Sequence, residues 1–325
     1  YLESSQESYK KEKIFYLGMM LEKLEMLDLK WRSKLQAPFI SKVLSNENSS
    51  SELGTALSHG VQDLKKRGIE KAIWSNEGLF DCLSQLTELL NKINLEGVEV
   101  IFISYIRSPM KWSLSAYKQW GIKHKTYEGP IITFKEYFLR NKLEIASKLE
   151  PILNSPHRLI LRNFDACSDS ILDFIKSLGI KTFPAERDLS HKLNSTPDNT
   201  ELLFRAAFND KIKNRCLPHA FDNQLHTKNI NFNWNPIKWM NDLLPDKGDF
   251  NSILKESTKE TDKLNILLAQ HDQPQFNSRL DNLMQDQKHT TLEQIIGSLM
   301  QIILTQNQRI VQIEREIKSD KSRNK

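Results

Sequence analysis

A predominantly apolar run, VEVIFISYI from Val98 to Ile106, limits the possible folds of the chain more than any other segment. The run is rich in β-branched and aromatic residues, and apolar and polar side chains do not alternate along it. A strand with one face in water alternates, whereas a strand covered on both faces does not. The run therefore predicts a central strand of a parallel sheet that is covered on both faces.

Two shorter runs predict further strands, KAIWS at 71–75 and HRLILRNF at 157–164. Between these runs lie stretches with helical spacing, for example Leu79, Leu83, Leu86, Leu89 and Leu90. Strands that alternate with helices indicate an α/β fold, a parallel sheet flanked by helices. Ligands bind such sheets beyond the carboxyl ends of the strands, where residues 75–77 and Arg107 fall.

Composition excludes several classes of protein. The 325 residues are 39% hydrophobic, which allows a large core, and 46 Lys and Arg against 41 Asp and Glu leave a net charge of +5, too small an excess to predict a nucleic-acid partner. Cys82, Cys167 and Cys216 show no Cys-x-x-Cys spacing, so we expect free thiols and no metal. Without an apolar run of about 20 residues or a secretory signal, we expect a soluble, cytoplasmic protein with no membrane span.

The chain divides into three predicted parts. Residues 1–271 form the α/β domain, in which 193–209 enter a late helix with Leu202, Leu203, Ala206 and Phe208 on its apolar side. Residues 222–245 predict loop and short helix. Residues 272–290 are rich in Gln, Asn and Asp and predict a linker, and 291–325 predict a helix.

The last segment has the periodicity of a coiled coil. Its apolar positions advance in alternating steps of four and three, with one polar member: Leu292, Ile296, Leu299, Ile303, Gln306, Ile310, Ile313 and Ile317. We expect a homo-oligomer held together through residues 291–318. The alternative is a single amphipathic helix that lies on the domain's own surface.

Arg107 and Ser115 predict a phosphate-binding site. A guanidinium suits the geometry of phosphate, and Ser115 on the first turns of the following helix adds a hydroxyl near the positive helix end. The densest basic stretch of the body follows, with Lys111, Lys118, Lys123, His124 and Lys125. An anionic substrate is therefore expected as well.

Arg107, Pro109, Trp112, Ser115, Tyr117 and Gln119 together resemble the pattern R-x-P-x-x-[RW]-x-x-S-x-Y-x-Q of sulfotransferases, in a form common in bacterial members. WSNEGLF (74–80), LILRNFD (159–165) with ILDFIKSLGI (171–180), and LNSTPDNTELLFRAAFN (193–209) are similar to other segments of that family, in the same order. The resemblance covers about residues 1–270. It implies a P-loop-like parallel sheet and transfer of a sulfuryl group from 3′-phosphoadenosine 5′-phosphosulfate, with adenosine 3′,5′-bisphosphate as product.

In this family the arginine and the serine of the pattern hold the nucleotide 3′-phosphate, a role that the resemblance carries to Arg107 and Ser115. The family's Gly/Lys/Ser/Thr-rich loop for the 5′-phosphosulfate does not occur in the sequence. Tyr1 and Leu2 are similar to the helix after that loop, so we expect either a fragment that begins just beyond the loop or a degenerate, inactive relative.

The acceptor site is predicted from the strand ends and from the aromatic residues. Glu77 is the candidate general base, with helix capping or contact with a substrate hydroxyl as alternatives. Ser75, Trp112, Tyr117 and Gln119 are expected to line the substrate, which we predict to be a carbohydrate or glycan.

Two other classes remain possible on the sequence. A P-loop nucleotide kinase or ATPase would need a Mg²⁺-binding Asp after a hydrophobic strand, and the run to Ile106 ends in Tyr-Ile-Arg instead. In a non-catalytic, oligomerising assembly or nucleotide-binding protein, the C-terminal coiled coil would carry the function, and the α/β domain would be either inert or a binding module.

Overall fold

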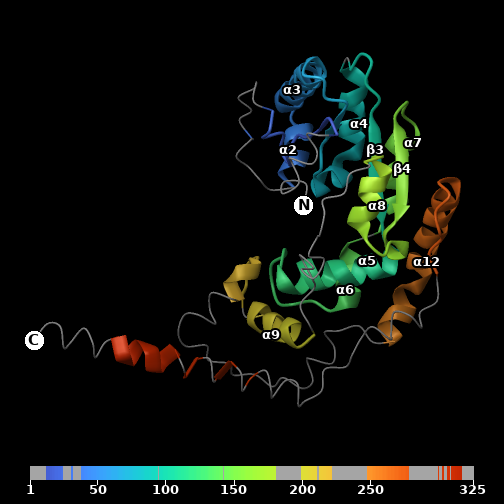
Figure 1. Cartoon of the computed structure of the whole chain (residues 1–325). Coiled ribbons are helices and arrows are strands. Elements are labelled where there is room, and N and C mark those ends of the chain that lie inside the picture. Colours follow the sequence, from blue (N-terminus) through green and yellow to red (C-terminus); the bar gives the residue numbers. More distant parts are fainter. Residues whose placement is uncertain are drawn as a thin grey trace, which may run out of the picture. The chain divides into compact units, whose positions relative to one another are not determined.

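The computed structural model is a mixed α/β protein (Figure 1). It describes residues 12–24, 31, 38–93, 95–141, 143–180, 199–210, 212–221, 247–277, 299, 302–303, 306–307 and 309–316. The chain forms two compact units. The first contains residues 1–109, 143–191 and 258–277, and the second contains 110–142, 192–257 and 278–325.

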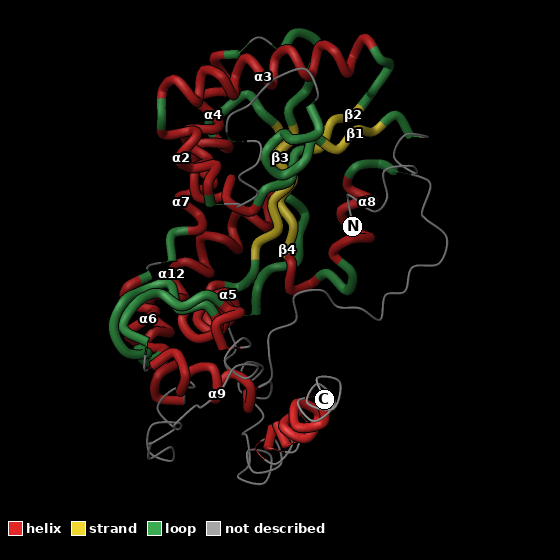
Figure 2. The backbone as a smooth tube through the Cα atoms, turned by 90° about the vertical axis from the view of Figure 1, so that its left-hand side faces the viewer, coloured by secondary structure: helices red, strands yellow, loops and turns green. Residues whose placement is uncertain are grey.

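The strands of the first unit form two parallel pairs, drawn in yellow in Figure 2. β1 (Ile14–Tyr16) pairs with β2 (Lys71–Ile73), and β3 (Ile101–Ile106) pairs with β4 (Arg158–Asn163). Three of these strands fall within the predicted runs and the pairing is parallel, so the α/β prediction is confirmed. β1 was not predicted.

The prediction that the run 98–106 is covered on both faces is wrong. In the described part of the chain β3 pairs with β4 alone, and along β3 only Ile106 is buried. Ile101 at the other end of the strand is 40% exposed. The apolar run thus forms a partly covered strand, in which Phe102 packs against two hydrophobic clusters and Ile106 is buried.

Helices α2 (Phe39–Ser45), α3 (Glu47–Lys66) and α4 (Leu83–Lys92) pack around one hydrophobic cluster of the first unit. The 3₁₀-helix η1 (Glu77–Cys82) leads directly into α4. Gly54 of α3 faces α4, and a Cβ at this position would lie 2.9 Å from side-chain atoms of both Leu89 and Ile93. The two helices therefore approach more closely than any larger residue at 54 allows.

Helices on the strand pairs complete the first unit. α7 (Ile145–Leu153) and residues 258–270 of α12 (Lys247–Gln270) share a hydrophobic cluster with β3 and β4. A short 3₁₀-helix, η3 (Phe164–Ala166), follows β4 and precedes α8 (Ser170–Ser177). Ile175 of α8 packs with β1 and β2 through Ile14 and Ile73.

The second unit is built from α5 (Pro109–Ala116), the π-helix η2 (Tyr117–Lys123), α6 (Phe134–Arg140) and α9 (Asn199–Asp210). Thr133 and Glu136 form a capping box that starts α6. α9 confirms the predicted late helix, and Leu202, Leu203 and Ala206 are buried. The Asn209 side chain joins α9 to η2 by donating to the Ile122 carbonyl at 2.6 Å.

The predicted linker begins later than residue 272. Asn163 Nδ2 donates to the Pro274 carbonyl at 2.7 Å, and Phe276 is only 6% exposed, so residues up to Asn277 pack on the first unit. The rest of the linker and residues 222–245 lie outside the described residues. Residues 299, 302–303, 306–307 and 309–316 are helical, as predicted, and belong to the segment drawn in red in Figure 1.

Cys82, Cys167 and Cys216 are all free thiols. Within the ranges given above, no helix is both long enough and apolar enough to cross a membrane.

Candidate functional site

The carboxyl ends of β3 and β4 place Arg107 beside the segment that follows β4. Ile106 and Asn163 are partners at the end of the parallel register, so Arg107 is the first residue after one strand and Phe164 is the first after the other. Asn163 fixes this second turn, because its side-chain oxygen accepts from Asp165 N at 2.9 Å and Ala166 N at 3.2 Å. The turn brings an acidic side chain next to the arginine.

Asp165 and Phe164 hold the Arg107 guanidinium. Nε donates to Asp165 Oδ1 at 3.4 Å, and the guanidinium carbon lies 5.2 Å from the centre of the Phe164 ring. The other carboxylate oxygen of Asp165 accepts from Ser108 N at 2.8 Å. The Asp165 side chain is 12% exposed, whereas that of Arg107 is 35% exposed. The Asp165 carboxylate is thus mostly enclosed by the turn, whereas the Arg107 guanidinium reaches the surface.

This arrangement leaves Arg107 suited to an anion. The contact with Asp165 is long and uses Nε, and among the described residues the two terminal nitrogens of Arg107 donate to no other group. Those nitrogens can form the paired hydrogen bonds with which arginine binds phosphate. Asp165 was quoted in the sequence comparison, but its role as the partner of Arg107 was missed, since the contact depends on strand register.

Glu77 and Ser75 follow β2 and are both exposed. The suggestion that Glu77 caps the next helix is wrong, because Asn76 is the cap of η1 and accepts from Gly78 N at 2.8 Å. Asn76 also donates to the Met19 carbonyl at 3.0 Å, which anchors the turn. The Glu77 side chain is therefore left for solvent or a ligand.

The segment after Glu77 shares a hydrophobic cluster with the end of β3. Ile106 and Leu83 are buried in this cluster, and Phe80 packs against it. Lys148 of α7 supports the same segment, with Nζ 2.6 Å from Asp81 and 5.6 Å from the centre of the Phe80 ring. η1 and the carboxyl end of β3 thus belong to one packed region of the first unit.

In the second unit, Trp112 and Ser115 are three residues apart on α5 and both are half-buried. Residues at this spacing lie on one face of a helix. Gln119 in η2 is half-buried as well, and the ring of Trp112 lies 6.2 Å from that of Trp120, which is 38% exposed. These side chains form a partly exposed polar and aromatic surface.

Ser115 is the seventh residue of α5, about 9 Å along the axis from Pro109 at 1.5 Å per residue. We expected the positive end of the helix dipole to strengthen anion binding at Ser115. This electrostatic effect is confined to the first turn of a helix and does not extend to Ser115. Arg107 belongs to the first unit and Ser115 to the second. Their convergence on one phosphate stays a prediction.

Tyr117 is a core residue and not the substrate contact that its place in the motif predicts. It is 0% exposed, and its ring packs on Phe134 and Tyr137 with centroid distances of 5.6 and 5.4 Å. Its hydroxyl donates to the Ile132 carbonyl at 2.8 Å. The residue therefore fixes η2 against α6.

Lys125 is likewise structural, although its sequence neighbours predict an exposed basic patch. It is 0% exposed, and Nζ donates to the carbonyls of Gly129 at 2.5 Å, Asn209 at 3.0 Å and Ile212. Burial lowers the pKa of Lys125, and it lowers the pKa of the neighbouring His124. The expected cationic surface thus loses one of its five members to the core.

A second arginine near the same strand ends was missed by sequence reasoning. Arg162 of β4 and its partner Tyr105 of β3 both bind Asp173 of α8. Arg162 Nε donates to Asp173 Oδ2 at 2.8 Å, a terminal nitrogen donates to Oδ1, and the Tyr105 hydroxyl donates to Oδ2 at 2.7 Å. The hydrogen bond from Arg162 holds the pKa of Asp173 below its ordinary value.

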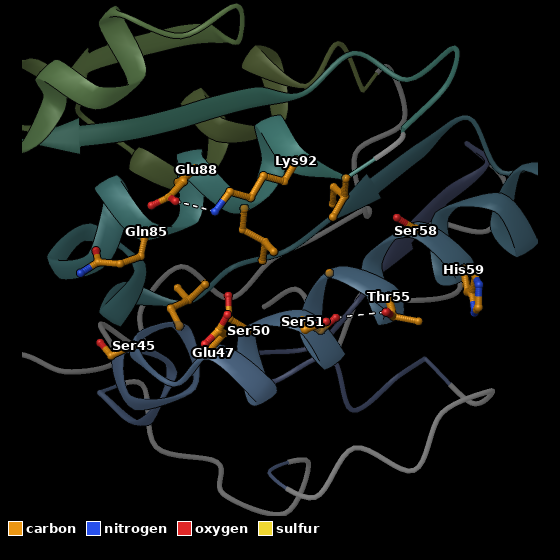
Figure 3. Close-up of a pocket in the computed structure, with 14 residues that line it drawn as sticks. Ser45, Glu47, Ser50, Ser51, Thr55, Ser58, His59, Gln85, Glu88 and Lys92 are labelled. Atoms are coloured by element: carbon orange, nitrogen blue, oxygen red, sulfur yellow. Dashed lines mark hydrogen bonds and ion pairs between the residues drawn. The ribbon is translucent and has the colours of Figure 1, made fainter.

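A separate groove of about 630 Å³ lies between α3 and α4 (Figure 3). Hydroxyl side chains line it from α3 (Ser50, Ser51, Thr55 and Ser58), and Gln85, Glu88 and Lys92 line it from α4. Thr55 donates to the Ser51 carbonyl, and Lys92 pairs with Glu88 at 2.5 Å. None of the predicted site residues lines this groove.

In the portion of the chain that the structure describes, no three His, Cys, Asp or Glu side chains are placed to hold a metal ion together. Comparison of the chain with models of known protein families, with curated proteins and with solved structures gives no match.

Proposed function

We propose that the chain is a sulfotransferase that moves a sulfuryl group from 3′-phosphoadenosine 5′-phosphosulfate to a hydroxyl of a carbohydrate or glycan acceptor. Arg107 and Ser115 bind the nucleotide 3′-phosphate. Glu77 is the general base, and Ser75, Trp112 and Gln119 contact the acceptor. We assign residues to the 3′-phosphate end only, because no Gly/Lys/Ser/Thr-rich loop for the 5′-phosphosulfate occurs in the sequence.

The observation that carries the proposal is the state of Arg107. It follows a parallel strand, its side chain is 35% exposed, and Asp165 and Phe164 fix it through Nε and the guanidinium face. Its terminal nitrogens donate to no other described residue, and Arg107 lies just beyond the carboxyl end of β3, where ligands bind to α/β sheets. A phosphate there would complete the hydrogen bonding of the guanidinium.

The chemistry requires positioned groups and no metal. The nucleotide supplies the sulfuryl group, and the acceptor oxygen forms a new S–O bond as the bond between sulfur and the phosphate oxygen breaks. Glu77 accepts the proton of the acceptor hydroxyl, and its exposure after β2 leaves the carboxylate accessible for this role. Arg107 holds the nucleotide away from the reacting bond, so it acts mainly on binding.

The acceptor class is inferred from the surface of the second unit. Trp112 and Trp120 lie 6.2 Å apart with their rings tilted by 52°, and Trp120 is 38% exposed. An exposed indole offers an apolar face to a sugar ring and a polar N–H to its hydroxyls. Gln119 and the lysines nearby add polar contacts that an anionic glycan would use.

Titration calorimetry with adenosine 3′,5′-bisphosphate and with adenosine 5′-monophosphate tests the nucleotide site. We expect the bisphosphate to bind more tightly, because only this ligand carries the 3′-phosphate. Arg107→Ala should weaken its binding at least tenfold, about 1.4 kcal/mol, since each charge-assisted hydrogen bond contributes about 1.5–3 kcal/mol. The monophosphate should not distinguish the two proteins.

Arg158→Ala is the matched control. Arg158 starts β4 at the opposite end of the strand pair, is 61% exposed and faces Glu99 at 3.8 Å. The Arg158→Ala variant should bind adenosine 3′,5′-bisphosphate with the same affinity as the unmodified chain. Equal losses in both variants would show a general effect of charge and not a phosphate site. No heat at about 1 mM ligand would reject the proposal.

A second candidate function is a non-catalytic assembly protein. The observation in its favour is the exposed apolar face of the C-terminal helix, where Ile303 is 59% exposed and Ile310 is 53% exposed. Oligomers that bind neither nucleotide would favour this function over the sulfotransferase.

A further inference from the structure

The C-terminal helix presents an apolar seam whose described residues are exposed. The described seam residues Leu299, Ile303, Ile310 and Ile313 are 41%, 59%, 53% and 50% exposed. They are spaced by four, seven and three residues, with Gln306 completing the heptad series between Ile303 and Ile310. A row of exposed aliphatic side chains at this spacing is the mark of a helix that pairs with another helix.

The residue types at the two seam positions indicate how many helices meet. The four residues at heptad position a are all isoleucine: Ile296, Ile303, Ile310 and Ile317. The four at position d are Leu292, Leu299, Gln306 and Ile313. β-branched residues at a with leucine at d favour two parallel strands, and isoleucine at both positions favours three or more. Leu292 and Leu299 follow the two-stranded pattern, Gln306 is polar, and only Ile313 has the residue type that favours three or more strands.

The polar member of the seam fixes the register. Gln306 is the single polar residue among the eight seam positions. In an in-register parallel pair it faces its own copy, and the two amides can hydrogen-bond to each other across the seam. Any shift by one heptad would place Gln306 against an aliphatic side chain and leave the amide without a partner.

The flanking charges select a second copy in parallel orientation. Arg309 precedes Ile310 and occupies position g, and Glu314 follows Ile313 and occupies position e. In a parallel coiled coil, position g of one helix pairs with position e five residues later in the other. Arg309 of each copy therefore faces Glu314 of the other, and both of these contacts join opposite charges. Glu316 and Lys321 repeat the same relation in the sequence.

We propose that the chain forms a parallel, in-register dimer through a two-stranded coiled coil of residues 291–318, with Arg309 of each copy paired to Glu314 of the other. The occupant of the exposed seam is thus a second copy of this chain. The dimer is independent of the nucleotide site, and each can be tested without the other.

Light scattering on the whole chain measures the mass of the assembly. We expect twice the 37.9 kDa of one chain, and Ile310→Asp should reduce this to a single chain. Val311→Asp is the matched control, because Val311 is a similarly exposed β-branched neighbour that lies off the seam. A monomer before any substitution would show that the helix packs on its own chain, and a trimer or tetramer would also overturn the proposal.

Oxidative crosslinking tests orientation and register. The thiols introduced by Ile313→Cys should join into a disulfide-linked dimer, because parallel register brings the two positions together. Val311→Cys should crosslink poorly, and the unmodified chain reports any background from its own thiols. Equal crosslinking at the two positions would refute a fixed seam.

Charge reversal tests the pairing of Arg309 with Glu314. Arg309→Glu and Glu314→Arg should each weaken the dimer about tenfold, because each creates like-charge contacts in place of two attractive ones. An equimolar mixture of the two variants should restore the dimer as a heterodimer. Failure of the mixture to exceed the separate variants would reject the parallel register.

Discussion

Two arginines near the carboxyl ends of the paired strands β3 and β4 are held in different ways. Arg162 makes two hydrogen bonds to Asp173, which also binds Tyr105, and its side chain is 27% exposed. Arg107 makes one contact of 3.4 Å to Asp165 and is 35% exposed. The Arg162 guanidinium is therefore part of the fold, whereas the fold positions Arg107 and leaves its terminal nitrogens without an acceptor among the described residues.

The largest effect should come from removing the shared acid. Asp173→Ala leaves Arg162 and Tyr105 without their acceptor in a partly buried region, so the free energy of unfolding should fall by about 3 kcal/mol. Urea denaturation followed by circular dichroism measures the change. A loss below about 1 kcal/mol would mean that the Asp173 network is no stronger than a surface ion pair. Arg162 and Arg107 would then not differ in their contribution to the fold.

Acid should remove the same stabilisation. The hydrogen bond from Arg162 lowers the pKa of Asp173 in the folded state below the unfolded value of about 3.9. Such a group stabilises the fold at pH values above its pKa in the unfolded state. This contribution is lost as the pH falls through its pKa in the folded state. The stability difference between the unmodified chain and Asp173→Ala should be constant from about pH 5 to 7 and shrink below about pH 4. An unchanged difference at about pH 3 would contradict the assignment.

Exchange of each arginine for lysine should separate the two roles. Arg162→Lys loses the paired geometry with Asp173 and should lower the free energy of unfolding by about 1.5 kcal/mol. Arg107→Lys should change stability by less than about 0.5 kcal/mol, since its ion pair is long and screened by solvent. The same Arg107→Lys change should weaken binding of adenosine 3′,5′-bisphosphate about tenfold. If Arg107→Lys lowers the free energy of unfolding more than Arg162→Lys does, Arg107 is the structural arginine and this assignment is wrong.

The smallest effect concerns the acid beside Arg107. Asp165→Asn keeps an oxygen for Ser108 N but removes the negative charge that competes with phosphate for the guanidinium. Affinity for the bisphosphate should rise about threefold, which corresponds to a gain of less than 1 kcal/mol. Calorimetry at low salt measures this gain, and a marked loss of affinity would show that the charge of Asp165 is needed to orient Arg107.

The sequence predicted those parts of the fold that local pattern controls. The runs at 71–75, 98–106 and 157–164 contain strands, and the leucines after residue 78 belong to η1 and α4. β1 was missed, although β2, which is equally short, was predicted. The coverage of β3 was wrong because an apolar run does not tell how many strands or helices lie against it.

The candidate site was predictable only in its residue types. Within one motif, Trp112 and Ser115 remain partly exposed while Tyr117 is buried, because Tyr117 lies four residues after the buried Ser113 on the face that packs against α6. The partners of the two arginines could not be predicted. Asp165 and Asp173 meet them only through strand register and the packing of α8.

The buried ammonium group of Lys125 gives the second unit a chemical property of its own. An amine enclosed by three carbonyl oxygens has no lone pair exposed to acylating reagents, whereas the exposed amines of Lys13 and Lys92 are open to attack. Lys125 becomes reactive only when the loop from 125 to 130 separates from the end of α9. Its labelling rate therefore reports the opening of the second unit alone, even while the first remains folded.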